Sequence, residues 1–460
     1  MANRTTKNGA DIATASKSKA KVATKTTQAK AEKKNLKTSA NEEDAEVIEV
    51  VAEVVDNVEE EDALLTEEIK KNTHIFDEFF DIDYAKSLSK LLQPIDRYYF
   101  RATMIGFDDD LGEFPERNNS ERPLIFVSNH SGMAFPWDGM VFASALMKMN
   151  GYRLDKSARG LASPLLSQTN LMNPFLIRNF WKRAGGIDAT SLNFETMMHY
   201  GESNFLIYPE GVKGIGKGFD KKYQLQRVSS SAVRMSIKYK TDIIPFATIN
   251  AEYINPFSYS LKWLDEMAQK VGIPFIPVGP LTTLILLQPW MFYFAAPAKL
   301  TYVRGKRIKP YEMIDKPFEE ITLDEFRGIT RKIQKEMQVE LTSMVEMYGQ
   351  KPYDWPDFFR SILQNFSKLP YFVPVAWPFL FTEHERRYRR FKTRLAQLTE
   401  DAREAFKQAY MDEKPREESL MGLVRTATDT ILKNPEVLLL YIPVIGWIPT
   451  LIKGFSREEE

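Results

Sequence analysis

His130 and Asp138 are the residues of this sequence whose types and spacing most directly suggest chemistry. In the stretch FVSNHSGMAFPWDG (126–139) the histidine follows an apolar run, and the carboxylate comes eight residues later, across a loop. A carboxylate beside a histidine fixes the imidazole tautomer and stabilises the imidazolium, so the pair can take a proton from an alcohol. In a single sequence two such residues are more often unrelated, so this hypothesis needs support from other segments.

Asn129 and Ser131 flank the histidine and indicate a polar rim rather than a packed core. Ser131 could act as a nucleophile, but no G-x-S-x-G elbow surrounds it. We therefore interpret Ser131 as a loop residue.

A second apolar run ends in Pro209-Glu210-Gly211 and continues into a glycine-rich loop that carries Lys213 and Lys217. Glycines let backbone N–H groups approach an anion, and lysines add positive charge. The loop is not a Walker A motif, since G-x-x-x-x-G-K-[ST] is absent. Taken alone, it is more typical of a surface loop with solvated lysines.

The elements that must position these residues follow from the hydrophobic pattern. Helices are predicted at 139–149 and 229–240, and buried strands at four apolar segments: 122–129, 203–210, 241–249 and 298–305. Apolar strands separated by helices indicate an α/β fold with a mainly parallel sheet covered by helices on both faces. Ligands bind outside the carboxyl ends of such strands, so His130 and Glu210 are expected at the same edge.

A further helix is predicted over 323–347. Thr322 and Glu325 form a capping box, and apolar residues follow at three- and four-residue spacings. This stripe predicts a core-facing helix.

Composition divides the 460 residues into three parts. Residues 1–70 form a tail, basic and then acidic, with too few large apolar residues to fold, so we expect disorder there. Residues 75–350 are expected to form the main domain, and 351–460 a helical extension associated with a membrane. The chain contains no cysteine, which excludes disulfides, thiolate metal sites and a cysteine nucleophile. The N-terminus lacks the apolar core of a secretory signal, so no export is expected.

Taken together and in this order, the motifs resemble those of the glycerolipid acyltransferase superfamily, which includes lysophosphatidic acid and glycerol-3-phosphate acyltransferases. Asn129, His130 and Asp138 are similar to its first block, and Tyr208 to Lys213 to its third block, Phe-Pro-Glu-Gly with a following arginine. IIPFATINAE is similar to the fourth block, APAKLTYVRGKRI to the closing strand and YYFRATMIGFDD to the approach to the first block. The resemblance covers about residues 95–345.

The departures from the pattern concern the acceptor. The commonest family spacing has four residues between His and Asp, whereas seven lie between His130 and Asp138. The longer loop resembles the branch with monoacylglycerol and diacylglycerol acyltransferases. Leu192 stands where the second block has arginine, and Lys213 replaces the arginine of the third. Lysine keeps the positive charge but lacks the bidentate guanidinium of arginine, which suits a phosphate. The sequence therefore favours a neutral alcohol acceptor over a phosphorylated one.

The resemblance implies acyl transfer from an acyl-CoA or acyl-carrier-protein thioester to a lipid alcohol, with no other cofactor. His130 would be the general base and Asp138 its orienting partner, while Glu210, Gly211 and Lys213 would bind substrate. No metal is implied, and the other three histidines show no ligand spacing. The implied partners are the acyl donor, the lipid acceptor, membrane lipids and, in one variant, an acyl carrier protein.

Three apolar segments favour peripheral or monotopic attachment to the cytoplasmic side of a membrane. Residues 271–298 are uncharged but interrupted by prolines, which favours a membrane-dipping or core-covering segment over a spanning helix. Residues 371–381 precede a basic cluster, and 437–452 are uncharged but short for a span. Ordinary core packing is the alternative for each segment.

Two other functions remain open from the sequence. The protein could acylate another lipid alcohol, or it could be a non-catalytic lipid-binding or scaffold protein of the same fold. A nucleic-acid partner is not expected, since only the basic tail would support one.

Overall fold

The computed structural model describes residues 61–164, 173–269, 275–412, 428–429, 431–433 and 435–448. The chain forms two compact units, Met1–Thr66 and Glu67–Glu460. The predicted disordered tail lies outside the described residues up to residue 60. Helix α3 (Glu61–Asn72) begins within the acidic stretch, where Ala, Leu, Glu and Lys favour a helix.

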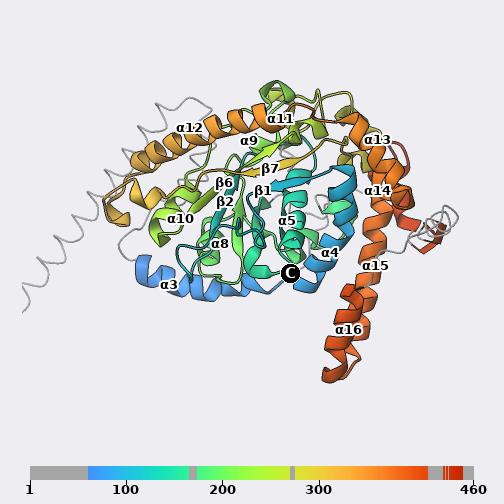
Figure 1. Cartoon of the computed structure of the whole chain (residues 1–460), viewed down its shortest axis with the longest axis horizontal. Coiled ribbons are helices and arrows are strands. Elements are labelled where there is room, and N and C mark those ends of the chain that lie inside the picture. Colours follow the sequence, from blue (N-terminus) through green and yellow to red (C-terminus); the bar gives the residue numbers. More distant parts are fainter. Residues whose placement is uncertain are drawn as a thin grey trace, which may run out of the picture. The chain divides into compact units, whose positions relative to one another are not determined.

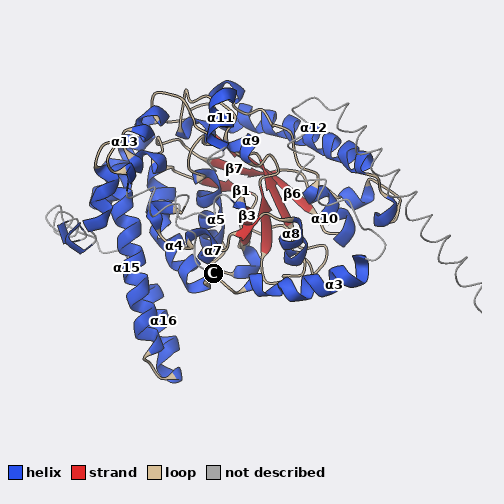
Figure 2. Cartoon of the chain, turned by 180° about the vertical axis from the view of Figure 1, so that it is seen from behind, coloured by secondary structure: helices blue, strands red, loops and turns tan. Residues whose placement is uncertain are grey.

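A sheet of seven strands forms the centre of the second unit (Figures 1 and 2). The strand order is β1 (Thr103–Ile105), β7 (Thr301–Arg304), β6 (Ile243–Ile249), β2 (Ile125–Ser128), β5 (Asn204–Ile207), β3 (Ala158–Ala162) and β4 (Ile187–Asp188). Strands β6, β2, β5, β3 and β4 run parallel, whereas β7 is antiparallel to β6 and parallel to β1. The mainly parallel sheet predicted from the sequence is therefore confirmed.

Helices cover both faces of this sheet, because successive side chains of a strand point to opposite sides. Phe126, Leu206 and Ile244 pack with α4 (Ile82–Pro94) and α5 (Trp137–Met149). Their strand neighbours, including Ile125 and Phe205, pack on the other side. That side is covered by α8 (Ser191–Met197), α10 (Ser231–Tyr239) and α12 (Leu323–Tyr348).

The sequence pattern predicted the long apolar strands and helices but did not predict the short strands. Strands β2, β5, β6 and β7 and helices α5, α10 and α12 have bounds within three residues of the predicted ones. The capping box of α12 is present, since Thr322 and Glu325 each accept a hydrogen bond from the other's backbone N–H. Strand β3 reads ARGLA and β4 has two residues, so neither has an apolar run to reveal it.

The C-terminal extension is helical where it is described. It contains α13 (Trp355–Gln364), α14 (Leu369–Phe372), α15 (Trp377–Ala396) and α16 (Glu400–Asp412). Helix α15 buries Trp377, Phe381 and Tyr388 in the same core as α4 and α5. The other α-helices within the described ranges are α7 (Phe180–Arg183), α9 (Val212–Ile215) and α11 (Lys262–Gln269).

Of the three apolar segments expected at a membrane, residues 371–381 lie in α14, a 3₁₀ turn and the start of α15, and they bury Phe372, Trp377 and Phe381 in the core. The other two segments form mainly loops and short turns in their described parts. Residues 275–298 contain the 3₁₀ turns Thr282–Leu286 and Pro289–Tyr293, and Pro435–Tyr441 is a further 3₁₀ turn. Residues 271–274 and 449–452 lie outside the described residues. Within the described ranges, no helix combines the length and apolar character needed to cross a membrane.

Candidate active site

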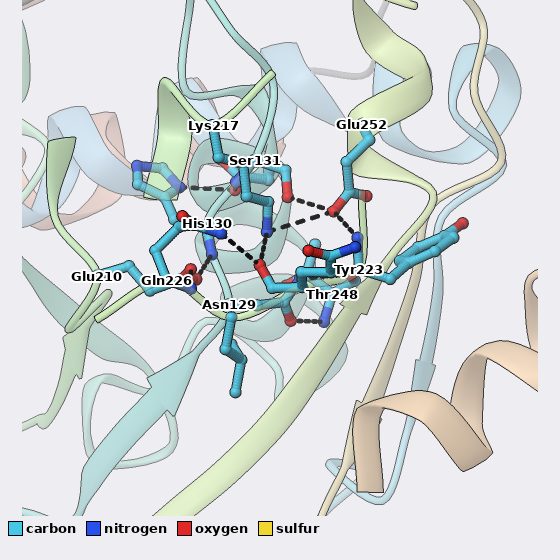
Figure 3. A network of polar contacts seen from close by, with 12 residues as sticks. Asn129, His130, Ser131, Glu210, Lys217, Tyr223, Gln226, Thr248 and Glu252 are labelled. Carbon is cyan, nitrogen blue, oxygen red and sulfur yellow. Dashed lines mark hydrogen bonds and ion pairs between the residues drawn. The ribbon is translucent and has the colours of Figure 1, made fainter. Parts of the chain in front are cut away.

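Polar residues follow three neighbouring parallel strands at the edge where each strand ends. His130 comes two residues after β2, Glu210 three residues after β5, and Glu252 three residues after β6. Because β6, β2 and β5 are adjacent and parallel, their carboxyl ends bring these residues into one cluster (Figure 3). The expected placement of His130 and Glu210 at one edge is confirmed.

His130 and Asp138 form a direct pair. Nδ1 of His130 lies 2.7 Å from Oδ2 of Asp138. The same oxygen accepts the backbone N–H of Ser131 at 3.0 Å, and Oδ1 accepts that of Gly139 at 2.8 Å. Asp138 is fully buried in the first turn of α5, where the helix dipole favours a negative charge. An ionised carboxylate can only accept, so Nδ1 carries the proton and Nε2 carries the lone pair.

The second ring nitrogen of His130, Nε2, determines what the His130–Asp138 pair can do chemically. The side chain of His130 is 11% exposed, and no hydrogen bond to its Nε2 is found among the described residues. A neutral imidazole oriented by a carboxylate, with its second nitrogen available, can accept a proton from a hydroxyl group.

Tyr208 fixes the plane of the imidazole. The two rings stack with centroids 4.3 Å apart and planes inclined by 23°. Burial, and secondarily the charge of Asp138, raise the pKa of Tyr208 well above its ordinary value. Its hydroxyl is buried and has no hydrogen-bond partner in the described part of the chain. The ring therefore acts as a packing wall rather than as an acid.

Glu210 was predicted to bind substrate. In the structure, its two carboxylate oxygens accept hydrogen bonds from backbone N–H groups. Oε1 accepts the N–H of His130 at 2.9 Å, and Oε2 accepts that of Gln226 at 2.5 Å. Burial raises the pKa of Glu210, while the charge of Lys217 and these two hydrogen bonds oppose that rise. The carboxylate thus joins the loop after β2 to the loop before α10.

Gly211 and Lys213 lie on the outer side of the same loop. Gly211 has φ +56°, which favours glycine, and it is exposed. Lys213 is also exposed and forms no ion pair within the described residues. Gly214 has a packing role that the sequence did not reveal. A Cβ there would lie 2.6 Å from Cβ of Glu210 and 3.0 Å from Cβ of His130, so only glycine lets α9 pack against the histidine.

Asn129 links the two central strands. Its amide accepts the N–H of Thr248 at 2.8 Å and donates to the carbonyl of Thr248 at 2.9 Å. Both contacts are buried. The asparagine beside the histidine therefore extends the pairing of β2 with β6 and fixes where the site loop starts.

The sequence interpretation missed Glu252 and gave Ser131 and Lys217 no part in this cluster. Ser131 donates its hydroxyl to Oε1 of Glu252 at 2.9 Å, and Nζ of Lys217 lies 3.5 Å from the same oxygen. Lys217 is buried, so the expectation of solvated lysines, which came from the composition of the loop, is wrong for this position. The position of Glu252 just after β6 was an available signal, since His130 and Glu210 follow β2 and β5 in the same way.

The chain is similar in sequence to mycobacterial proteins that have no assigned function. The chain is 26% identical over 194 residues to a protein of Mycobacterium tuberculosis described as uncharacterized, covering 42% of this chain and 50% of that one. It is 25% identical over 234 residues to an uncharacterized protein of Mycobacterium leprae, covering 49% and 59%. The chain thus spans about half the length of the curated relatives it matches. No family model and no solved structure matches.

Proposed function

We propose that this protein is an O-acyltransferase of glycerolipid type that moves a fatty acyl group from an acyl thioester to a lipid hydroxyl. The observation that carries the proposal is the 2.7 Å contact between His130 and Asp138 at the carboxyl edge of a mainly parallel sheet, where Nε2 of His130 has no hydrogen-bond partner among the described residues. The resemblance of the surrounding motifs to the glycerolipid acyltransferase superfamily supplies the reaction class.

The proposed reaction needs one proton acceptor and no acyl-enzyme. Nε2 of His130 takes the hydroxyl proton of the acceptor as its oxygen attacks the thioester carbonyl. The C–S bond then breaks, the ester forms, and the thiolate takes the proton back from the imidazolium. Asp138 holds the imidazole by Nδ1 and stabilises its cationic form. General-base assistance of this kind contributes about 10²–10⁴-fold in rate.

Lys213 and Gly211 are the candidates for contact with the acceptor, because both are exposed beside the cluster. An unpaired lysine on the rim can meet an anionic headgroup, although it lacks the two-pronged geometry of arginine. Lys213→Ala should therefore raise KM for a phosphorylated acceptor by about tenfold, since a hydrogen bond to a charged group contributes roughly 1.5–3 kcal/mol. Turnover of a neutral acceptor with unchanged KM in this variant would identify the neutral alcohol as the substrate. Lys240→Ala, another exposed lysine, is the control.

Exposed apolar side chains support attachment to a membrane beside this site. Trp263 and Met267 of α11 are 61% and 57% exposed, and Leu286 is 60% exposed. The segment that carries α11 is bonded to the site loop, since the N–H of Phe219 donates to the carbonyl of Ser258 at 2.8 Å.

The C-terminal segment extends the apolar surface. Val444 donates its N–H to the carbonyl of Leu287 at 2.8 Å, and both residues are exposed. Peripheral or monotopic binding to the cytoplasmic side of a membrane is the proposed location. Sedimentation with liposomes tests it. Trp263→Ser with Leu286→Ser should reduce binding, and a protein that stays in the supernatant at every lipid concentration contradicts it.

The decisive experiment for the function is a substrate panel. Purified protein is incubated with acyl-CoA and acyl-carrier-protein donors and with phosphorylated and neutral lipid alcohols, and the products are identified by mass spectrometry. A new ester that disappears in the His130→Ala variant supports the proposal. Lipid binding without any ester from the whole panel favours the non-catalytic alternative.

A further inference from the structure

We propose that Glu252, held by Lys217, is a positioning residue that fixes Ser131 and, through Ser131, the His130–Asp138 pair. The inference rests on the proposed function for its kinetic part. Figure 3 shows the three residues beside the histidine, in a network of hydrogen bonds and ion pairs.

Ser131 lies between two buried carboxylates. Its backbone N–H donates to Oδ2 of Asp138 at 3.0 Å, and its hydroxyl donates to Oε1 of Glu252 at 2.9 Å. Oδ2 of Asp138 is also the oxygen bonded to Nδ1 of His130. A shift of Ser131 therefore changes the position of the oxygen that orients the imidazole.

Glu252 is itself held from two sides. Its Oε1 accepts the N–H of Tyr223 at 3.0 Å and lies 3.5 Å from Nζ of Lys217. Lys217 also donates to the carbonyl of Gln224 at 3.2 Å. The side chains of Lys217 and Glu252 are only 2% and 4% exposed. The pair thus ties the loop of residues 217–224 to the end of β6.

A stabilising role alone is a weak explanation for this ion pair. Burying two charges has a desolvation penalty that can cancel their attraction, and apolar residues of similar size are often as stable or more stable. Here the pair also leaves Oε2 of Glu252 buried without a partner in the described residues. Apolar residues could not accept a hydrogen bond from the Ser131 hydroxyl. Glu252 accepts it, and this hydrogen bond connects the Lys217–Glu252 pair to His130 through Ser131.

Two double variants separate positioning from stability. Both replace Lys217 by Met, so neither leaves Lys217 or Glu252 as an unpaired buried charge, and the loss of the Lys217 charge near Glu210 is the same in both. One adds Glu252→Gln, which keeps an oxygen for Ser131, and the other adds Glu252→Leu, which removes it. If Glu252 positions Ser131, kcat should be about tenfold lower in the leucine variant than in the glutamine variant, with equal KM. The variants are compared at a temperature where both are fully folded.

A spectroscopic readout keeps the test independent of turnover. The proton on Nδ1 of His130 should give a low-field NMR signal because it lies in a short hydrogen bond to a carboxylate. The His130→Gln variant assigns that signal. We expect the signal to persist in the Lys217→Met, Glu252→Gln variant and to broaden or vanish in the leucine variant.

The same signal in both double variants would overturn the positioning role, whatever the protein acylates. A protein that esterifies nothing, yet loses the signal only in the leucine variant, would refute the proposed function and leave the positioning role intact. Ser131→Ala should reproduce the leucine variant, and Ser131→Thr, which keeps the hydroxyl, should restore the signal. Loss of the signal in Ser131→Thr but not in Ser131→Ala would also overturn the inference.

Discussion

His130 and His384 lie in two buried polar clusters of the same unit, and the clusters are built in opposite ways. His130 has a buried carboxylate on one nitrogen, and its second nitrogen has no hydrogen-bond partner in the part of the chain that the structure describes. His384 has the hydroxyl of Ser87 at 3.0 Å from Nε2 and lies against the rings of Tyr84 and Tyr388. Burial, which Glu385 opposes and Arg183 reinforces, lowers the pKa of His384 to about 4. One histidine is therefore equipped to accept a proton, and the other is kept neutral.

The surroundings of His384 show what the second cluster does. Nη1 of Arg183, from α7, donates to both oxygens of Glu385, from α15, at 3.0 Å. The guanidinium of Arg183 lies 3.8 Å from the ring centroid of Tyr84 on α4. The cluster thus fastens α15 to two helices of the main domain. The comparison shows that a buried histidine gains chemical capacity only with a carboxylate on one nitrogen and space at the other.

The largest expected effect is on turnover, from the first histidine. His130→Ala should lower kcat at least about 100-fold, because the proton acceptor is removed. The melting temperature should fall as well, because the buried ring stacks on Tyr208 and pairs with Asp138, so turnover is compared at a temperature where both proteins are folded. The measurement is ester formation under saturating substrates, with thermal unfolding of the same samples.

The matched control is His384→Gln, which should leave kcat unchanged and lower the melting temperature. Equal turnover in folded His130→Ala and wild type would contradict the assignment of the base.

The second effect is on stability, from the other cluster. Arg183→Met leaves Glu385 buried with its remaining contact to Arg389, and breaking a buried pair costs about 3 kcal/mol. Urea unfolding measures this change, and kcat of the folded variant should equal that of wild type. Arg387→Met, at an exposed position of α15, which also carries Glu385, is the control for the loss of a charge. Stability within 0.5 kcal/mol of wild type, on the order expected for surface changes, would show that the cluster does not fasten α15.

A third, smaller effect is expected from Asp138, the partner of the proposed base His130. Asp138→Asn keeps the shape of the side chain but removes the charge that favours the imidazolium. It also places an N–H₂ group among three N–H donors. We expect kcat about tenfold or more below wild type, and less affected than in His130→Ala. A greater loss in Asp138→Asn than in His130→Ala would mean that Asp138 acts in another way than through the histidine.

Sequence patterns predicted the parts of this comparison that depend on local order along the chain. The apolar runs that end at His130 and Glu210 placed both residues at one edge, because adjacent parallel strands end on the same side. The eight-residue spacing suggested the His130–Asp138 pair but could not establish it. Contacts between distant segments were not predictable. Ser131 meets Glu252 from 121 positions away, and Arg183 meets Glu385 from 202 positions away.

Which lysine of the glycine-rich loop is buried and which is exposed could not be predicted either. Lys213 and Lys217 lie in the same glycine-rich loop, and nothing in their local sequence distinguishes them. Lys213, within α9, is exposed, whereas Lys217, two residues after the end of α9, is buried against Glu252. Only the position of a partner contributed by β6 decides which lysine points inward.

The smallest effect is a dependence of stability on pH that originates from His384. Its pKa is about 4 in the folded protein and near 6.5 when unfolded, so the unfolded chain binds the extra proton between these values. Stability from keeping this histidine neutral is therefore complete above pH 6.5 and is lost as the pH falls toward 4. Between pH 7 and pH 5.5 the loss should be on the order of 1 kcal/mol in wild type. His384→Gln, which carries no titrating group, should lose less by that amount when urea unfolding is measured at both pH values. His130→Gln serves as the comparison, because it retains His384 and should keep the wild-type pH dependence from that group. Identical pH dependence in His384→Gln and wild type would show that His384 is not held neutral, and the contrast between the two histidines would fail.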